Sequence, residues 1–188
     1  KHIAASDARV MAGELTETTD EHFTSPDGQT RLFRSTKTPL RDPQGNVIGL
    51  AGVSIDVTAD RAAMAALKTS EERFRTLSET APAFIFITDE HGAITYTNSA
   101  FQNYTGKSNE DLLGMGWVRT VHRDDREIPQ KAWDAAMQDG KPYAAEYRFR
   151  NSDGEFRWFM CRATPLLDDA GAIKQWIGTC SDIQAAID

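Results

Sequence analysis

Two small groups of residues in this chain are of types that could do chemistry. His122, Asp124 and Asp125 bring an imidazole and two carboxylates together, and both are ordinary metal ligands. A metal site is the minor interpretation, because a bound ion needs a fuller ligand set than these neighbours supply. Cys161 and Cys180 would need an adjacent base to act as nucleophiles, and no histidine lies near either in the sequence. We therefore predict no catalytic residue and no metal site.

Phosphate and paired-acid chemistry are not indicated either. The chain contains no Walker loop, and no G-x-G-x-x-G pattern follows a predicted strand. Adjacent carboxylates at Glu71-Glu72 and Asp168-Asp169 lie on a predicted helix and at a predicted turn, where solvation and capping explain them. These patterns predict that the chain is not an enzyme.

The composition excludes several classes of partner. The chain has 188 residues, 40% of them hydrophobic and 26% charged, as expected of a globular protein of one or two domains. A net charge of −7 argues against nucleic acid and anionic membranes as partners. No apolar run approaches the roughly 18 residues of a membrane span, so we expect no membrane contact from this chain. With only two cysteines, we expect no disulfide framework and predict a cytoplasmic location.

The sequence contains an internal repeat, and the repeated unit must position any functional residues. Residues 23–58 align without a gap on residues 149–184, an offset of 126, and 12 of the 36 positions are identical. Unrelated sequences would share about two, so the repeat predicts a duplicated structural unit. Asp-Gly pairs at 27–28 and 153–154 predict tight hairpins, and a second turn follows in each copy. Each copy is therefore predicted to be a three-stranded antiparallel meander.

A symmetric second turn would fix the register of each meander. Closure at Asp42/Gly45 and at Asp168/Gly171 places an arginine directly opposite an aspartate in both copies, and opposite residues share one face of the sheet. The pairs are Arg31 with Asp56 and Arg157 with Asp182. Each pair is interpreted either as a surface ion pair or as a coupling between the sheet and the helix that follows it. The same register makes Cys161 and Cys180 diagonal neighbours, which we expect to be reduced.

The segments outside the meanders predict two further strands and several helices. Residues 84–89 and 94–97 have strand character around a turn, Ser108 to Asp111 has capping-box spacing, and a helix is expected from about 125 to 139. Residues from Thr58 to about Ala81 lack glycine and proline and should form a helical linker. The linker positions Leu67, Phe74 and Leu77 are predicted to form either a short coiled-coil seam or a face that covers the chain's own domain.

Residues 74–184 resemble the Per-Arnt-Sim (PAS) sensory family, with its PAC-type C-terminal motif. The resemblance rests on the order and spacing of short motifs rather than on one specific element. The matching residues are Asn98, Phe101, Thr105-Gly106, Leu112-Leu113-Gly114, Trp117, Val121-His122, Asp124-Asp125, Glu146-Tyr147-Arg148, Asp153-Gly154, Arg157-Trp158, Pro165-Leu166, Gly171, Gly178 and Ser181-Asp182-Ile183. Arg123 stands where the family usually has proline, and Gln184 replaces its closing threonine.

The resemblance implies an α+β fold and a division of the chain. The expected PAS fold has a five-stranded antiparallel sheet with helices on one face. It is preceded by the C-terminal half of a second PAS domain and a helical linker. The predicted parts are a partial domain over 1–58, the linker over 59–80, a complete domain over 81–184 and the start of an exit helix over 185–188. The resemblance also implies that the segment at His122 closes a loop and caps the next helix.

The resemblance further implies a ligand pocket between sheet and helices. The residues predicted to line it are Tyr147, Phe149, Trp158, Met160, Ile177 and Thr179. Covalent flavin is not expected, because no cysteine lies between residues 62 and 160, and haem is not expected, because the long helix has no histidine. The ligand is unknown: non-covalent flavin, a small metabolite and an empty packed core all stay open.

The function implied by the resemblance is that of a cytoplasmic sensory module in a bacterial signalling protein. A two-component sensor histidine kinase is the leading interpretation, with the kinase part outside this chain because no ATP-binding or phosphoacceptor motif occurs. The expected partners are a second copy of the chain, through the linker helices or the PAS surface, and a small-molecule ligand. The alternatives are a ligand-free interaction scaffold and a flavin-dependent redox sensor.

Overall fold

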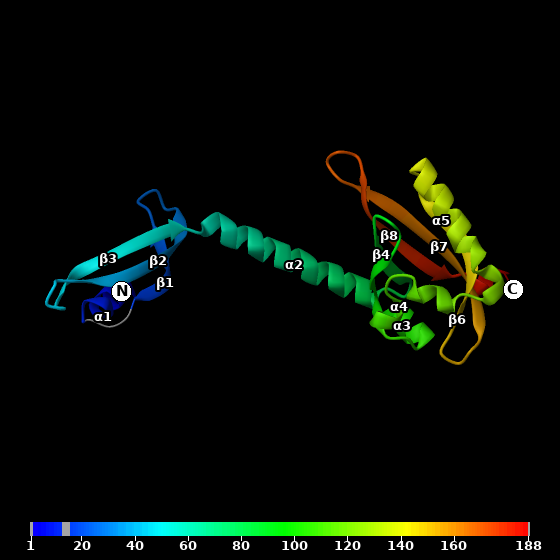
Figure 1. Ribbon diagram of the computed structural model, residues 1–188, viewed down its shortest axis with the longest axis horizontal. Helices are drawn as coiled ribbons and strands as arrows, with labels where there is room; N and C mark the ends of the chain where they lie inside the picture. The colour runs from blue at the N-terminus through cyan, green and yellow to red at the C-terminus, as the bar shows by residue number, and fades with distance from the viewer. Residues whose placement is uncertain (1, 13–15, 188) are drawn as a thin grey trace. The chain divides into compact units, whose positions relative to one another are not determined.

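The computed structural model describes residues 2–12 and 16–187 (Figure 1). The chain divides into two compact units, which we call the first and second units, between Glu72 and Arg73 within one long helix. Each unit has its own antiparallel sheet. Within the described residues, no helix is both long enough and apolar enough to cross a lipid bilayer.

The first unit is a three-stranded meander with one helix against it. Its strands follow one another across the sheet in the order β1-β2-β3, and α1 contacts all three. The elements are α1 (His2–Met11), β1 (Glu17–Thr24), β2 (Thr30–Arg41) and β3 (Val47–Asp56). Gly28 and Gly45 take positive φ angles of 84° and 88° in the two connections, which glycine adopts without steric cost. The predicted first meander is therefore confirmed.

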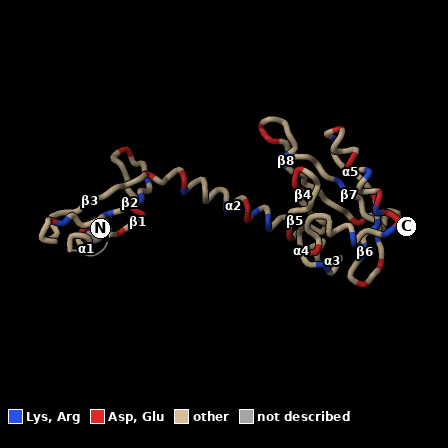
Figure 2. The backbone as a smooth tube through the Cα atoms, viewed as in Figure 1, with Lys and Arg blue, Asp and Glu red and all other residues tan. Residues whose placement is uncertain are grey.

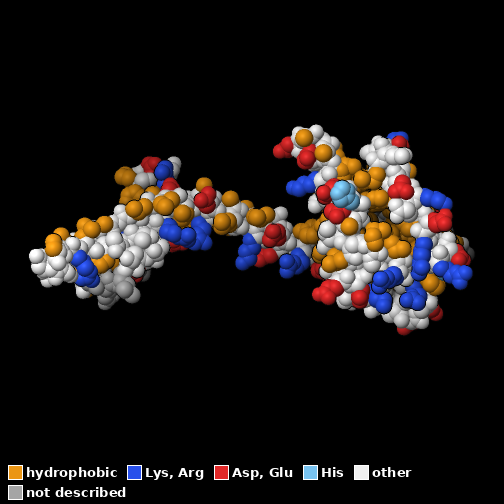
Figure 3. Space-filling view, in the orientation of Figure 1, with side chains coloured by type: hydrophobic (Ala, Val, Ile, Leu, Met, Phe, Trp, Pro, Cys, Tyr) orange, Lys and Arg blue, Asp and Glu red, His pale blue; other side chains and the backbone are white. Residues whose placement is uncertain are grey.

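The predicted linker helix is α2 (Thr58–Thr80). Its sequence offers no glycine or proline to interrupt the helical hydrogen bonds, and it ends just before Pro82. Lysine, arginine and acidic side chains gather on its C-terminal half (Figure 2), while hydrophobic side chains follow its visible face (Figure 3).

The second unit has the five-stranded antiparallel sheet that the resemblance implies. The strand order is β5-β4-β8-β7-β6, so β8 pairs with the first strand of the unit on one side and with β7 on the other. The strands are β4 (Phe84–Asp89), β5 (Ile94–Thr97), β6 (Tyr143–Arg150), β7 (Phe156–Leu167) and β8 (Ile173–Asp182). The helical elements are α3 (Ser99–Thr105), α4 (Asn109–Leu112), η1 (Gly116–Thr120), η2 (Arg123–Asp125), α5 (Glu127–Asp139) and α6 (Gln184–Ile187).

Local sequence signals account for several of these helical elements. The predicted capping box forms at α4, where Ser108 accepts from the Asp111 backbone N–H and the Asp111 carboxylate accepts from Ser108. The predicted long helix is α5, which ends at Gly140 in the left-handed conformation. The predicted exit helix begins at Gln184, and Asp188 lies outside the described residues.

The core of the second unit is aromatic and lies between the sheet and these helices. Alternate residues of each strand point into it, so Phe84 and Phe86 of β4 face Phe159 of β7, whose ring stacks on Phe84 at 4.6 Å. Phe101 of α3 stacks on the other side of Phe84 at 4.8 Å. This packing fixes which face of each strand can border a cavity.

The two units repeat the same substructure at the predicted offset of 126. The elements α1, β1, β2 and β3 correspond to α5, β6, β7 and β8, and even the register shift after Leu40 recurs after Leu166. The duplication is thus confirmed and extends back from the aligned strands to the preceding helix.

The predicted register of the meanders is wrong by two residues. Asp56 lies opposite Phe33 rather than Arg31, and Asp182 lies opposite Phe159 rather than Arg157. One residue of the error lies in the turn, where the backbone N–H of Asp42 donates to Asn46 and that of Asp168 donates to Ala172, one position beyond the predicted closure. The irregularity after Leu40 and Leu166 adds the second residue. A two-residue shift preserves the face, so each arginine still reaches its aspartate diagonally.

The cysteine prediction is also corrected. Cys161 and Cys180 lie directly opposite one another, with Cα atoms 4.0 Å apart, and form a disulfide instead of remaining reduced diagonal neighbours. The same two-residue shift explains the change, because it brings the two Cβ atoms onto one cross-strand pair.

Candidate ligand-binding site

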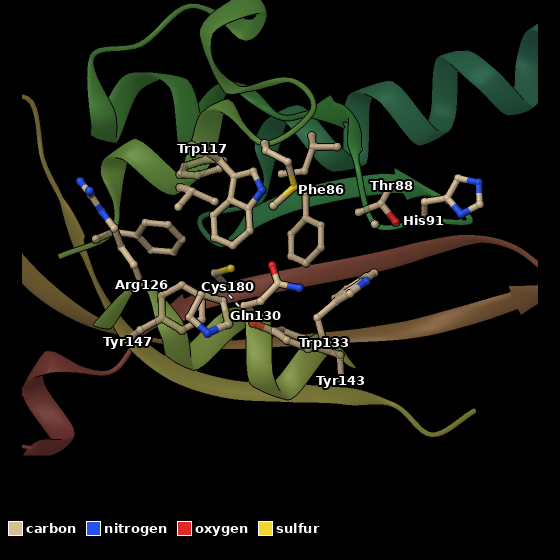
Figure 4. A pocket seen from close by; sticks show the side chains of 17 residues that line it. Phe86, Thr88, His91, Trp117, Arg126, Gln130, Trp133, Tyr143, Tyr147 and Cys180 are labelled. Atoms are coloured by element: carbon tan, nitrogen blue, oxygen red, sulfur yellow. Dashed lines mark hydrogen bonds between the residues drawn. The ribbon is translucent and has the colours of Figure 1, made fainter. Parts of the chain in front are cut away.

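A cavity of about 230 Å³ lies between the sheet and the helices of the second unit. The inner faces of β4, β6 and β8 form one side of it and residues of η1 and α5 form the other (Figure 4). An apolar cavity of about 150 Å³ is enough for benzene, so this one suits a compound of one or two rings. The site can therefore hold a small molecule without unfolding any element.

The cavity walls are mostly aromatic. Phe86, Trp117 and Trp133 enter from β4, η1 and α5, and Tyr143 and Tyr147 enter from β6. Figure 4 shows Gln130 and Cys180 between these rings. Aromatic faces on several sides favour a flat ligand, which they hold by offset stacking.

Two glycines make room for the aromatic walls. A Cβ atom at Gly178 would overlap the Phe86 ring, and one at Gly92 would overlap the indole of Trp133. Gly92 also has a φ angle of 93° in the turn after β4. Each glycine therefore allows an aromatic side chain to approach the backbone closely and to border the cavity.

The polar groups around the cavity are few and mainly donors. The hydroxyls of Tyr143 and Tyr147 lie 3.3 Å apart, so one phenol can donate to the other. Burial raises the pKa of Tyr143 to about 12 and raises the pKa of Tyr147 well above its ordinary value. The buried indole nitrogens of Trp117 and Trp133 have no hydrogen-bond partner among the described residues. Both nitrogens are almost wholly covered, so the tyrosine hydroxyls are the donors that a ligand with a hydrogen-bond acceptor would match.

A buried ion pair holds the helical wall against the sheet. Asp125 of η2 accepts hydrogen bonds from the backbone N–H, Nε and Nη2 of Arg148 at 3.0, 2.7 and 2.6 Å. These bonds to Arg148 lower the pKa of Asp125 below its ordinary value. Asp125 is 4% exposed, so α5 starts from a fixed point beside β6.

The His122 segment forms a cap, as the resemblance implies. The Nδ1 atom of His122 accepts from the Asp124 backbone N–H at 3.2 Å, and its ring lies 4.5 Å from the Phe156 ring. Asp125, the third residue considered as a metal ligand, is engaged by Arg148. Among the described residues, no group of three or more histidine, cysteine, aspartate or glutamate side chains is placed to hold a metal.

Two of the six predicted pocket residues border the cavity. They are Tyr147 and Phe149. The prediction is wrong for Trp158, Met160, Ile177 and Thr179, which lie on the outer face of the sheet. Phe159, Cys161, Gly178 and Cys180 are their neighbours along β7 and β8, and because side chains alternate, these neighbours point inward instead. On the outer face Trp158 lies under the Arg148 guanidinium at 5.1 Å.

The residues missed by sequence reasoning come mainly from the helical side. Trp117, Gln130 and Trp133 border the cavity, but η1 is too short to show periodicity. Tyr143 had a usable signal, because it lies on the same face of β6 as the predicted residues Tyr147 and Phe149.

The predicted arginine–aspartate pairs form in both units. The Arg157 Nη1 atom lies 2.9 Å from Asp182 Oδ2, and the Arg31 Nη1 atom lies 3.8 Å from Asp56 Oδ2. All four side chains are at least one-third exposed. Their role in coupling stays a prediction.

The three linker residues differ in their surroundings. Phe74 lies 5.8 Å from the Tyr96 ring and so covers part of its own domain. Leu67 and Leu77 are 62% and 72% exposed. The two interpretations of the linker therefore apply to different residues, and the seam prediction now rests on the two leucines.

An antiparallel five-stranded sheet with helices enclosing a cavity on one face defines the class of fold. Residues 94–180 match a family model described as PAS fold, and residues 2–62 match a second PAS-fold model. The chain belongs to the PAS family. Its two matches fall in the two structural units, in agreement with the internal repeat.

Several curated relatives are named as signalling proteins. Peroxide stress-activated histidine kinase mak1 of Schizosaccharomyces pombe is 30% identical over 168 residues, which are 81% of this chain and 10% of that protein. The two-component sensor PprA of Pseudomonas aeruginosa is 29% identical over 134 residues, 71% of this chain and 14% of that protein. The chain thus spans a small fraction of the length of these relatives.

Solved structures agree on the fold. An RNA-binding Light-Oxygen-Voltage receptor matches 99% of this chain and 82% of its own, with a TM-score of 0.55 and 13% identity. A PAS domain from Colwellia psychrerythraea matches 61% of this chain and 97% of its own, with a TM-score of 0.51 and 21% identity. At these identities the comparison concerns the fold.

Proposed function

We propose that this chain is the sensory region of a cytoplasmic two-component signalling protein of the sensor histidine kinase type. The observation that carries the proposal is the aromatic cavity of about 230 Å³, which borders the strand that leads to the exit helix. Cys180 lines the cavity, and two residues later Asp182 ends β8. A ligand in the cavity would therefore act directly on the end of the sheet.

The ligand in this proposal is a flat compound of one or two rings that carries hydrogen-bond acceptors. The aromatic walls supply stacking, and the tyrosine hydroxyls supply hydrogen-bond donors. The stimulus names of the relatives differ from one another, from peroxide stress to C4-dicarboxylate transport, so they do not select the ligand.

The route from sheet to helix in this proposal is a joint that occurs in both units. In the first unit Thr58 Oγ1 accepts from the Leu32 backbone N–H at 2.8 Å, and the Thr58 backbone N–H donates to Asp56. In the second unit Gln184 Oε1 accepts from the Trp158 N–H at 3.1 Å, and the Gln184 N–H donates to Asp182. Gln184, which stands where the family usually has threonine, thus makes the same kinds of hydrogen bond as Thr58.

A second joint would carry motion from α2 into the sensing unit. Asn98 is fully buried, and its side-chain nitrogen donates to the carbonyls of Ser78 and Ala83. Its side-chain oxygen accepts from the Ile85 N–H, so the end of α2 and the start of β4 are held by one residue. A displaced helix would therefore pull on the start of β4, a strand that borders the cavity.

A second copy of the chain is the proposed partner of α2. Leu67 and Leu77 leave apolar surface exposed along the helix, and dimer formation through the linker would cover it (Figure 3). We expect Leu67→Asp to weaken self-association in sedimentation experiments. Unchanged association would rule out the linker seam. The matched variant Lys68→Asp, on an exposed residue beside it, should leave association unchanged.

In this proposal the region itself is not an enzyme, and phosphotransfer takes place elsewhere in the protein. Covalent flavin chemistry does not fit the residues present, because the chain has two cysteines and both are in the disulfide on the sheet. Haem does not fit either, because α5 has no histidine and the imidazole of His91 is 81% exposed at the rim. Non-covalent flavin is the alternative cofactor, since its ring would stack on the same walls.

The proposal is tested by measuring thermal stabilisation of the chain by a panel of one- and two-ring aromatic compounds. A binder at 100 times its dissociation constant adds about 2.7 kcal/mol to the free energy of unfolding. Val118→Trp, which narrows the cavity, should abolish the shift, whereas Val53→Trp on exposed β3 should keep it. If nothing stabilises the chain and denaturation releases no small molecule, the ligand-free scaffold is the better interpretation. A flavin absorption band would instead support the redox alternative.

A further inference from the structure

The disulfide between Cys161 and Cys180 occupies a special place in the fold. Cys161 is fully buried and Cys180 is 3% exposed, and the pair lies on the inner face of the central strands β7 and β8. Cys180 also borders the cavity (Figure 4). A redox change at this pair would therefore act on the cavity and not on the surface.

The first unit shows that the sheet does not need this bond. Ser35 and Ser54 occupy the same cross-strand position in β2 and β3, and their hydroxyls are joined by a hydrogen bond of 2.8 Å. The registers of the two hairpins agree at the offset of 126. The backbone thus holds two small side chains in contact without a covalent link, which is the arrangement a reversible link requires.

We propose that Cys161 and Cys180 form a reversible thiol–disulfide site whose oxidant is hydrogen peroxide that enters through the cavity. The Cys180 sulfur attacks one peroxide oxygen, the O–O bond breaks, and a sulfenic acid and water form. The Cys161 sulfur then attacks the Cys180 sulfur, the S–S bond forms, and a second water leaves. In total, two thiols and one hydrogen peroxide give one disulfide and two waters.

The order of attack follows from access. Cys180 borders the cavity, whereas Cys161 does not and has no exposed surface. Hydrogen peroxide is small and uncharged and can enter an apolar cavity of this size. Glutathione disulfide is large and charged, and it would have to reach sulfur atoms that are almost wholly covered.

Reduction should change the shape of the cavity. Two unbonded sulfur atoms cannot lie as close together as two bonded ones, so the thiols must separate. β8 is hydrogen-bonded on both sides, to β4 and β7, and this holds the backbone in place. The Cys180 side chain borders the one large cavity found in the described part of the second unit and would turn into it. This step rests on the proposed ligand-sensing function, whereas the redox chemistry does not.

The first experiment counts thiols in the full chain. The reduced protein is exposed to hydrogen peroxide or to glutathione disulfide and is then denatured. A maleimide labels each free thiol, and mass spectrometry counts the labels. We expect protein treated with hydrogen peroxide to carry no maleimide label, and protein treated with glutathione disulfide to carry two. Dithiothreitol added after peroxide should restore both labelled thiols. Peroxide that leaves two labels, or that yields only stable sulfinic acid, would overturn the proposal.

The second experiment assigns the attacking sulfur. Cys161→Ser should accumulate a Cys180 sulfenic acid that dimedone traps, and Cys180→Ser should give at least 10-fold less adduct. Equal trapping in the two variants would overturn the order of attack. The first unit's serine pair indicates that serine is tolerated at this place, and circular dichroism of each variant checks its fold.

The third experiment compares melting temperatures. Reduction should lower the melting temperature of the wild-type second unit by about 10 °C. The double variant Cys161→Ser/Cys180→Ser, which copies the first unit, should be unaffected by reductant. No shift in the wild type would contradict a redox-dependent structure. None of these readouts needs a ligand. If the thiols react reversibly in a chain that binds no compound, the ligand-sensing function is contradicted and the redox site is not.

Discussion

The two units share a backbone but differ in the chemistry of their inner walls. Tyr143 and Ala163 face each other across β6 and β7 in the second unit, where the first unit pairs Glu17 with Lys37. Tyr147 likewise corresponds to Glu21 at the same offset. The turns and the alternation of the strands are common to both, so they suffice for the meander, and the inner wall is free to vary.

The helices that cover the two inner faces, α1 and α5, also differ in chemistry. In the first unit α1 brings Asp7 to 2.7 Å from the Lys37 Nζ, and Glu21 lies 3.0 Å from it on the other side. In the second unit α5 brings Trp133 against Tyr143 and Trp176. A charged wall is satisfied by its own ion pairs, whereas an aromatic wall can border a cavity.

The sheet edges differ as well. In the second unit β8 pairs with both β4 and β7, but in the part of the chain that the structure describes β3 pairs only with β2. Its outer face carries Val53 and Ile55, which are 64% and 60% exposed. The comparison therefore predicts that the second unit is the more stable of the two.

The largest expected effect on stability comes from replacing an inner-face aromatic residue of the second unit by the charged residue of the first unit. Tyr147→Glu places a carboxylate at the position that corresponds to Glu21, but Ala163 stands where the first unit has Lys37, the lysine that Glu21 contacts. We expect a loss of about 3–5 kcal/mol in the free energy of unfolding at pH 7, measured by urea denaturation. Tyr147→Phe should cost only about 1 kcal/mol. The loss from the glutamate should shrink as the pH falls, because its neutral form tolerates burial. An unchanged stability would mean that water reaches this wall freely.

A second large effect is expected at the ion pair that holds the helical wall. Asp125→Ala leaves the buried donors of Arg148 without their acceptor, and we expect a loss of about 3 kcal/mol. The control Glu127→Gln breaks an exposed i,i+4 pair with Lys131 and should cost less than about 0.5 kcal/mol. Equal losses in thermal denaturation would show that burial does not distinguish the two pairs.

The same pair predicts an acid dependence. The pKa of Asp125 is lowered in the folded state by its hydrogen bonds to Arg148. Its contribution is therefore fully present above the unfolded pKa near 3.8 and is lost as the pH falls through the lower folded value. The melting temperature of the wild type should drop in that range more steeply than that of Asp125→Ala. Parallel curves would contradict the assignment.

The sequence predicted the fold well because its signals were local or repeated. The turn residues, the capping box at Ser108 and the uninterrupted linker each specify their element without help from distant residues. The register prediction failed, because neither the wider turn closure from Asp168 to Ala172 nor the irregularity after Leu166 is marked by a turn residue. That one shift also hid the cross-strand contact of Cys161 and Cys180.

The cavity was harder to predict than the fold. Its outer-face errors, such as Trp158 and Ile177, arose because aromatic and aliphatic residues occur on both faces of β7 and β8. The outer-face residue Ile177 is itself half-buried, and this weakens the alternation of polar and apolar residues that would mark the inner face of β8. Trp117 and Trp133 depend on how helices far along the chain pack on the sheet, and no local pattern encodes that packing.

A smaller effect is expected in the charged wall of the first unit. Lys37→Met leaves the carboxylates of Asp7 and Glu21 close together, and we expect a loss of about 2 kcal/mol at pH 7. Hydrogen bonding to Asp7 raises the pKa of Lys37, so its contribution is present below the unfolded pKa near 10.5 and is lost at higher pH. Lys131→Met, on an exposed pair, is the control for denaturation experiments. If both lysines matter equally, the inner wall of the first unit is not a specific ion-pair site.

The smallest effect on stability is expected where the two units are most alike. Arg157→Asp or Asp182→Arg breaks an exposed pair at 2.9 Å and should cost at most about 1 kcal/mol, and the charge-swapped double variant should restore that loss. The matched pair Arg31 and Asp56, at 3.8 Å, should contribute less. Under the proposed function, the informative measurement is the signalling output of a protein that carries the swapped pair. Normal stability with altered output would show that the pair couples sheet to helix, because Asp182 also accepts from the Gln184 N–H at the start of α6. Normal output would leave both pairs as surface ion pairs.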